Sequence, residues 1–237
     1  MSAGLSLTIL MTKNMSSKNN ILGIDTATAE TVIGLNGEVV SWISNRNQSK
    51  ELLPAIDKLI RSQKLTPQQV RGIVVNTGPG SFTGLRVGLT VANGFGYGLK
   101  IPVVGMSEFD VIRLVYPKVD LIILDAKRGE LFVQSGKQKP KLISATKLGE
   151  MIKRGTSVYL EINLAVVLHP QLKKVGTIYL TEIPRIEKMA AMLKAGASHP
   201  ALKLRDGLRG SVVKSKKFSL VLPMYLRGAN ITKPKVR

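Results

Sequence analysis

A short apolar run, a glycine-rich loop and a long helical pattern follow one another in this sequence and constrain its fold more than any other feature. The apolar run predicts a buried strand over residues 72–76. The loop reads NTGPGSFTGLRVG over residues 76–88, and the apolar positions after it predict a helix over 84–99. A strand that leads through a tight loop into a helix is a building unit of α/β sheets, so we expect an α/β fold.

Glycine loops between a strand and a helix often bind phosphate, because backbone N–H groups and helix N-termini attract anions. A Walker A loop would end in Gly-Lys-Ser/Thr, whereas here Gly84 is followed by Leu85 and Arg86. The lysine that binds phosphate and the hydroxyl that binds Mg²⁺ are therefore both missing. Arg86 is a weak candidate for anion binding, because a guanidinium offers a bidentate fork, and an equal candidate for an ion pair. We favour a loop that orients the helix.

A carboxylate ends the first predicted strand, ILGID (21–25). Several phosphotransferase folds place such a carboxylate, followed by a glycine-containing turn, around nucleotide phosphate and Mg²⁺. Here the turn over residues 26–28 contains no glycine. Two interpretations of Asp25 stay open, a degenerate nucleotide site and a carboxylate that caps the hairpin, and we favour the second.

The first half predicts three strands and then alternating helices and strands. Asn36-Gly37 joins the second and third strands, and this dipeptide is a strong hairpin signal. Ser49 is the expected N-cap of the first helix. The predicted elements are strands 21–25, 31–35 and 38–44, helix 49–63, strand 72–76, helix 84–99, strand 102–105 and helix 107–115.

The same pattern restarts in the second half, in a shorter and less regular form. Asp125 and Glu130 flank a basic turn there, which is more typical of a hairpin with local ion pairs than of an acid–base pair. Two consecutive βββαβα-like halves predict a duplicated α/β architecture. The predicted elements are strands 120–126, 130–135 and 140–144, helix 145–154, strands 157–161 and 176–180, helix 184–195, a loop or irregular helix over 197–218 and an apolar segment over 218–226.

These patterns predict four parts of the chain. They are a disordered leader (1–20, with Met1, Met11 or Met15 as the start), an N-terminal lobe (21–116), a C-terminal lobe (117–226) and a basic tail (227–237). We expect neither a signal peptide nor a membrane helix. The sequence has no cysteine and only two histidines, which excludes disulfides and thiolate or histidine-rich metal sites. A cytoplasmic location is the expectation that follows.

Positive charge is concentrated in the second half. The net charge is +20, and residues 137–237 contain 21 basic and 5 acidic residues, a net +16. Such an excess favours polyanionic partners, nucleic acid above all, with Lys214, Lys216 and Lys217 as weak candidates for contact. Solubility, or a generally basic proteome, is the alternative explanation.

The helices predicted at 49–63 and 84–99 are apolar for surface elements, and the second contains several glycines. Each interior glycine costs about 0.5–1 kcal/mol relative to alanine. A close approach of another element would compensate for this cost. That element belongs either to the same chain or to a partner.

One long segment closely resembles the signature of the TsaB (YeaZ) family, the dimerisation subunit of bacterial tRNA threonylcarbamoyladenosine synthesis. It reads NTGPGSFTGLRVGLTVANGFGYGLKIPVVGMSEFDVI over residues 76–112. The resemblance is strong from about 21 to 135 and thin from 136 to 217. Gln48 stands where family members usually have a histidine, and Gly94, Gly96 and Gly98 stand where many have alanine. Shorter matches follow in order in ILGIDTAT (21–28), SKELLPAIDKLI (49–60), ILDAKRGELF (123–132) and LPMYLRG (222–228).

The resemblance implies an actin-like ATPase (ASKHA) fold of two RNase H-like lobes, without catalysis, metal or cofactor of its own. It implies a scaffold that binds and activates a TsaD-type threonylcarbamoyltransferase, which modifies N6 of adenosine 37 in tRNA. A TsaE-type ATPase joins this assembly. A nucleotide at the interface with the partner, and a homodimer when the chain is alone, are further expectations.

The resemblance also assigns the two apolar helices to the dimer face. Two alternatives remain, a small-molecule kinase with Asp25 and Asp125 holding Mg·ATP, and a tRNA-binding module that uses the basic half. The expected interface residues are Leu52, Leu53, Ile56, Ile60, Leu85, Arg86, Gly88, Leu89, Ala92, Asn93, Phe95 and Gly96.

Overall fold

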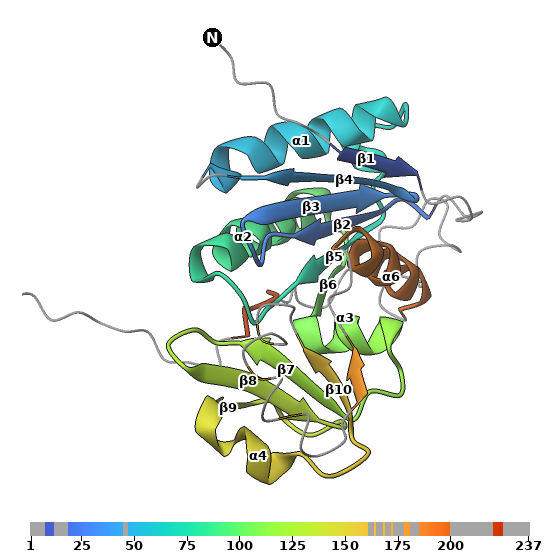
Figure 1. The fold of residues 1–237 in the computed structure, drawn as a ribbon. Coiled ribbons are helices and arrows are strands. Elements are labelled where there is room, and N and C mark those ends of the chain that lie inside the picture. The colour runs from blue at the N-terminus through green and yellow to red at the C-terminus, as the bar shows by residue number, and fades with distance from the viewer. Residues whose placement is uncertain are drawn as a thin grey trace, which may run out of the picture. The chain divides into compact units, whose positions relative to one another are not determined.

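The chain forms two compact units in a computed structural model (Figure 1). The first contains the described residues up to Pro117 together with 185–199 and 220–224, and the second contains those between 118 and 182. The structure describes residues 8–11, 19–44, 47–160, 178–180, 185–199 and 220–224 and the single positions 164, 168 and 172.

A mixed sheet of six strands, in the order β1-β4-β3-β2-β5-β6, forms the centre of the first unit. Strands β1 to β4 pair antiparallel, while β2, β5 and β6 run parallel. The predicted hairpin is confirmed, because Asn36 and Gly37 both have positive φ, 50° and 86°, between β3 and β4. The strands are β1 (Thr8–Met11), β2 (Ile21–Asp25), β3 (Glu30–Leu35), β4 (Glu38–Ile43), β5 (Gly72–Asn76) and β6 (Val103–Met106).

Strand β1 corrects the prediction of a wholly disordered leader. Thr8–Met11 pair antiparallel with β4, with Thr8 opposite Ser41. This added strand covers the backbone hydrogen-bonding edge that β4 would otherwise leave open. The rest of the leader, except residues 19–20, lies outside the described residues.

Helices cover both faces of this sheet. Leu22 and Ile24 point from β2 into one core beneath α1 (Gln48–Ser62) and α2 (Phe82–Leu99). Ile21 points to the opposite core, which lies beneath α6 (Arg185–Ser198) and α3 (Glu108–Val115). The alternation follows from the strand period of two and explains why these strands read as continuous apolar runs. A short 3₁₀ turn, η1 (Pro67–Gln69), precedes β5.

Two helix starts differ from the prediction. Ser49 is not the N-cap of α1, because the helix begins at Gln48 after Asn47, whose side chain makes no capping hydrogen bond. Helix α2 begins two residues early, at Phe82, because the Ser81 side chain accepts a hydrogen bond from the Gly84 N–H.

Helix α6 belongs to the first unit, although the sequence placed the stretch 184–195 in the C-terminal lobe. Its residues Met189, Met192 and Leu193 are 0–1% exposed and pack in the same core as Val74. A Cβ atom at Gly23 of β2 would collide with the Met189 sulfur, so the strand lies unusually close to the helix. The helical period predicted this element but carried no information about which sheet it would cover.

The sheet of the second unit repeats the topology of the first. Its order, β11-β10-β7-β8-β9, with β7 to β9 antiparallel and β7, β10 and β11 parallel, matches that of β6-β5-β2-β3-β4. The predicted helix 145–154 is shorter, with a 3₁₀ turn η2 (Ala145–Lys147) leading into α4 (Leu148–Met151). The strands are β7 (Leu121–Asp125), β8 (Glu130–Ser135), β9 (Lys141–Ser144), β10 (Ser157–Leu160) and β11 (Ile178–Leu180).

The described part of the chain contains no helix with both the length and the apolar character needed to cross a membrane.

Candidate functional site

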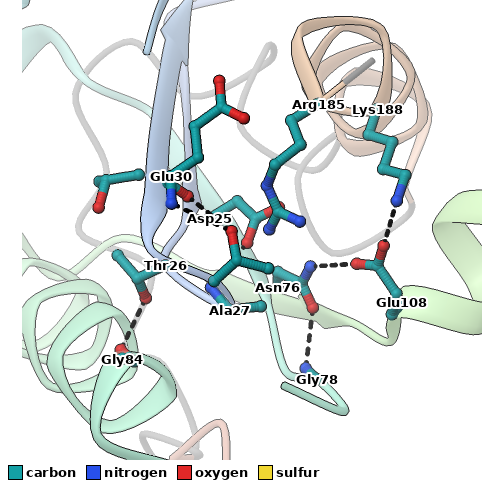
Figure 2. A network of polar contacts seen from close by, with 12 residues as sticks. Asp25, Thr26, Ala27, Glu30, Asn76, Gly78, Gly84, Glu108, Arg185 and Lys188 are labelled. Carbon is teal, nitrogen blue, oxygen red and sulfur yellow. Dashed lines mark hydrogen bonds and ion pairs between the residues drawn. The ribbon is translucent and has the colours of Figure 1, made fainter. Parts of the chain in front are cut away.

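The glycine loop between β5 and α2 folds back onto the turn between β2 and β3. The Ser81 N–H donates a 2.7 Å hydrogen bond to the Ala27 carbonyl. The Thr26 hydroxyl donates a 2.8 Å bond to the Gly84 carbonyl, as Figure 2 shows. The turn that a nucleotide-binding fold would direct toward phosphate is therefore covered by this chain's own loop.

Close approach of these two segments explains the glycines at the start of α2. A Cβ atom at Gly80 would lie 2.5 Å from the Ala27 carbonyl oxygen. At Gly84 and Gly88 a Cβ atom would collide with the Thr26 carbonyl and hydroxyl, respectively. For these glycines the compensating neighbour lies in the same chain, which supports the interpretation of a loop that orients the helix.

Asp25 is 1% exposed and lies at the end of β2. One of its carboxylate oxygens accepts the Ala27 N–H at 2.9 Å, which confirms the hairpin-capping interpretation. The other oxygen accepts a 2.8 Å bond from the guanidinium of Arg185 on α6. The charge that a phosphotransferase would place near Mg²⁺ is thus balanced by an internal cation.

A second buried ion pair joins α3 to α6. The Glu108 carboxylate accepts a 2.5 Å bond from the Lys188 ammonium and a 2.7 Å bond from the Asn76 amide. Asn76 in turn accepts the Gly78 N–H at 2.8 Å, and the Glu108 N–H donates to the Gly78 carbonyl at 2.8 Å. This network, drawn in Figure 2, ties the first residues of the glycine loop to α6.

The surrounding charges favour the charged forms of Glu108 and Arg185. Burial alone would raise the pKa of Glu108, but the charges of Lys188 and Arg185 and the hydrogen bonds from Lys188 and Asn76 hold that pKa below its usual value. Burial alone would lower the pKa of Arg185, yet the carboxylates of Asp25, Glu108 and Glu30 raise it. Both acids are matched to a cation at hydrogen-bond distance, an arrangement that suits docking of α6 better than proton transfer.

The sequence singled out Asp25 and missed the other members of this network. Arg185 follows Asp25 by 160 positions, and Lys188 follows Glu108 by 80. No local pattern predicts pairs at such separations. The one available signal was two basic residues three positions apart on an apolar helix, which places both on one face.

The remaining candidates for catalysis are engaged locally. The Arg86 guanidinium lies 3.9 Å from the centre of the Phe82 ring, a cation–π contact within α2. Asp125 pairs with the Lys127 ammonium at 2.5 Å and accepts its N–H at 2.6 Å, which confirms the predicted hairpin with a local ion pair. Within the described residues no three His, Cys, Asp or Glu side chains gather as a metal site would require.

Most of the predicted interface residues face the chain's own sheet, which corrects their assignment to a partner surface. An amphipathic helix directs its apolar side chains to the sheet it covers, so the helical period identified the inner face. The buried ones are Leu52, Ile56, Ile60, Leu85, Gly88, Leu89, Ala92 and Gly96. The other four differ, since Leu53 and Arg86 are exposed and Asn93 and Phe95 are half-buried.

The exposed side of α2 offers a different surface, which we call the outer face. Gly94 and Gly98 lie on it, and no neighbouring element of the described chain comes within 4 Å of the point where a Cβ atom would stand on either residue. Tyr97 is 72% exposed beside them. The spacing of four residues keeps this row on one side of the helix. The outer face comprises Phe82, Arg86, Thr90, Gly94, Tyr97 and Gly98, all exposed.

The predicted nucleic-acid contacts Lys214, Lys216 and Lys217 lie outside the described residues and stay a prediction.

Comparison with known proteins identifies the family. A family model described as TsaD, tRNA N6-adenosine threonylcarbamoyltransferase, matches residues 20–205, well over half of the chain. The chain belongs to this family. Relatives named TsaB, tRNA threonylcarbamoyladenosine biosynthesis protein, confirm the resemblance to the TsaB (YeaZ) family.

The protein from Bacillus subtilis is 31% identical over 121 residues, which are 50% of this chain and 51% of that protein. The Escherichia coli protein is also 31% identical over 121 residues, 47% and 52% of the two chains.

The alignments to these TsaB relatives thus span about half of their length. Two solved structures extend the similarity at the level of the fold. One, described as an uncharacterised protein with similarity to peptidase YeaZ from Pseudomonas aeruginosa, has a TM-score of 0.60 at 18% identity and covers 87% of this chain and 99% of its own. YeaZ from Pseudomonas aeruginosa has a TM-score of 0.55 at 16% identity, covering 75% and 92%. Together with the two mixed sheets, these similarities support an ASKHA-like α/β fold.

Proposed function

We propose that this chain is a non-catalytic, cytoplasmic subunit in the biosynthesis of tRNA threonylcarbamoyladenosine, and that it binds and activates a TsaD-type threonylcarbamoyltransferase through the outer face of α2. The names of its relatives support the pathway. The observation that carries the docking surface is the row of exposed glycines and large side chains along α2.

Two glycines on this row are costly unless another molecule covers them. Gly94 and Gly98 each lower helix stability by about 0.5–1 kcal/mol relative to alanine, and the described part of the chain places nothing against them that compensates. Glycines allow the backbone of a partner helix to approach closely. Tyr97 on α2 is 72% exposed and is a side chain of the kind that anchors interfaces, and Leu53 on α1, 47% exposed, adds apolar surface.

The non-catalytic role is supported by the buried ion pairs. Asp25 is neutralised by Arg185, and the adjoining turn is covered by the glycine loop. A kinase with Asp25 at Mg·ATP would have to break a buried ion pair and displace this loop. We therefore place any bound nucleotide at the interface with the TsaD-type partner, with a TsaE-type ATPase as a further component.

The experiment that tests the docking surface compares two glutamate substitutions. Gly94→Glu puts a charge into the outer face of α2, and Gly149→Glu puts the same charge on α4 in the second unit, where the space around the Cβ position is open among the described residues. We expect Gly94→Glu to weaken binding to the TsaD-type subunit by about 100-fold, roughly 2.7 kcal/mol, in calorimetry. Gly149→Glu should bind like the unmodified chain.

Equal affinity of the Gly94→Glu and Gly149→Glu variants would contradict the proposed surface. Tyr97→Glu provides a second variant at an exposed position of the same face. Substitutions at Leu89 or Ala92 would not test it, because those side chains are 3% and 0% exposed and their replacement by glutamate damages the fold itself.

A second candidate function is direct tRNA binding, either by the chain alone or within the complex. It is favoured by the net charge of +16 over residues 137–237. Reversal of Lys214, Lys216 and Lys217 should then lower tRNA affinity and its salt dependence while leaving subunit binding unchanged.

A further inference from the structure

A short extended segment late in the chain, Leu220–Met224, lies on α2 and β6 of the first unit. The Asn93 side chain donates its amide N–H to the Val221 carbonyl at 2.9 Å and accepts the Val221 N–H at 3.1 Å. Both backbone groups of one residue are thus bound by a single side chain of α2. The Met224 N–H donates a 2.7 Å hydrogen bond to the Thr77 carbonyl at the end of β5.

The Val221 side chain packs against the core beneath α1 and α2. A Cβ atom at Gly105 of β6 would lie 2.6 Å from Val221 Cγ1 and 2.7 Å from Thr77 Cγ2. Gly105 therefore leaves the space that Val221 occupies. Asn93, Thr77 and Gly105 together form a seat that binds the backbone of the segment and accepts one small apolar side chain.

Binding of Leu220–Met224 at this position leaves two large apolar side chains exposed. Val221 packs inward, whereas its neighbours Leu220 and Leu222 are 60% and 71% exposed. Asn93 lies one helical turn before Tyr97 of the outer face. The two leucines are therefore held next to the face proposed to bind the partner.

We propose that Leu220–Met224 is a strap that completes the partner-binding surface of α2, with Asn93 as the positioning residue that holds it. The partner that binds this surface is the TsaD-type subunit, so this inference rests on the proposed function. Continuity with the outer face supports that choice, since Asn93 belongs to the same helix as Tyr97. The sequence interpretation placed Asn93 in the interface as a direct contact, whereas here it acts through Leu220 and Leu222.

The test uses the full chain and separates seating of the strap from its contribution to binding. Asn93→Ala removes both hydrogen bonds to Val221, and Asn93→Asp removes only the bond to the carbonyl. Leu222→Asp leaves the seat intact and alters only the outward surface. Met151→Asp, at an exposed apolar position of α4 in the second unit, is the matched control.

Amide hydrogen exchange reports seating without any partner. We expect the Val221 and Met224 amides to exchange at least about 10-fold faster in Asn93→Ala, less so in Asn93→Asp, and at the unmodified rate in Leu222→Asp and Met151→Asp. Unchanged exchange in Asn93→Ala would overturn the strap.

Calorimetry with the TsaD-type subunit reports binding. Asn93→Ala and Leu222→Asp should each weaken affinity by about 10-fold or more, and Met151→Asp should leave it unchanged. If exchange accelerates in Asn93→Ala but both variants bind normally, the strap's role in docking is overturned and the proposed function stands. If the unmodified chain does not bind the subunit, both the proposed function and the docking role of the strap are wrong. Amide exchange still shows whether Asn93 holds the strap in place.

Discussion

Among the described residues of the first unit, the buried charged side chains form two ion pairs. Asp25 with Arg185, and Glu108 with Lys188, connect α6 to elements that precede it by 80 or more positions. All four side chains are at most 9% exposed. Taking ions out of water is costly, and loss of one partner leaves the other uncompensated. These pairs therefore favour one docking position and register of α6, together with its apolar contacts to the sheet.

Removal of one member of a pair should be severe. Glu108→Gln removes the carboxylate with which the buried Lys188 ammonium pairs at 2.5 Å, so we expect a loss of about 3–5 kcal/mol in the free energy of unfolding. Urea denaturation at pH 7 measures it. Asp57→Asn, at an exposed ion pair with Arg61, is the matched control and should change stability by less than about 0.5 kcal/mol. A comparable effect of the two substitutions would contradict the role of the buried pair.

The same variant has a defined pH dependence. The folded pKa of Glu108 lies below its usual 4.5, so its ionised form stabilises the fold above pH 4.5, and this contribution is lost as the pH falls through the folded pKa. The cost of Glu108→Gln should accordingly be full at pH 7 and shrink below pH 4.5. A cost that stays constant well below that pH would show that Lys188 is compensated in another way.

At the level of elements, α2 uses glycine for two different purposes. Gly84 and Gly88 lie on its inner side against Thr26, whereas Gly94 and Gly98 lie on the outer face. The sequence showed that this helix is rich in glycine, but it did not show which glycines face inward and which face outward. The helix is apolar around most of its circumference, so the sequence pattern does not distinguish its two sides. Burial in the structure separates the two groups.

Replacing glycine by alanine at one inner and one outer position of α2 tests this assignment of the two faces. Gly88→Ala should lower the free energy of unfolding by about 1–3 kcal/mol, because its methyl group collides with the Thr26 hydroxyl. Gly94→Ala should raise it by about 0.5–1 kcal/mol, because it improves helix propensity where space is open. Thermal unfolding of the two variants gives the comparison. The two changes in the free energy of unfolding should have opposite signs, and changes of the same sign would contradict the assignment of the faces.

At the level of the whole molecule, the first unit is discontinuous in sequence. The described chain completes its first sheet and the alternating helices by Pro117, but the core beneath Val74 and Val104 is closed by Met189, Met192 and Leu193 of α6. A chain cut after 117 therefore lacks one cover of its sheet. The boundary expected at 116 marks the end of an element and not the end of a folding unit.

A fragment ending at Pro117 should consequently fail to fold cooperatively. Its exposed sheet face should bind a hydrophobic dye and give weak near-ultraviolet circular dichroism, as loosely packed states do. A peptide spanning 185–199, added in trans, should restore a cooperative transition. A fragment with a sharp unfolding transition and no response to the peptide would show that α6 is dispensable for this unit.

Local sequence patterns were enough to predict the main elements from residue 21 onward, the Asn36-Gly37 hairpin, the repeated strand pattern and the family. These features depend on local periodicity, on turn chemistry and on one long signature segment. Three-dimensional packing was needed to show that Leu52 and Leu89 face inward, that α6 covers the first sheet and that Arg185 pairs with Asp25. These outcomes depend on which surfaces meet across as many as 160 positions, and packing and charge burial are satisfied only in the folded molecule.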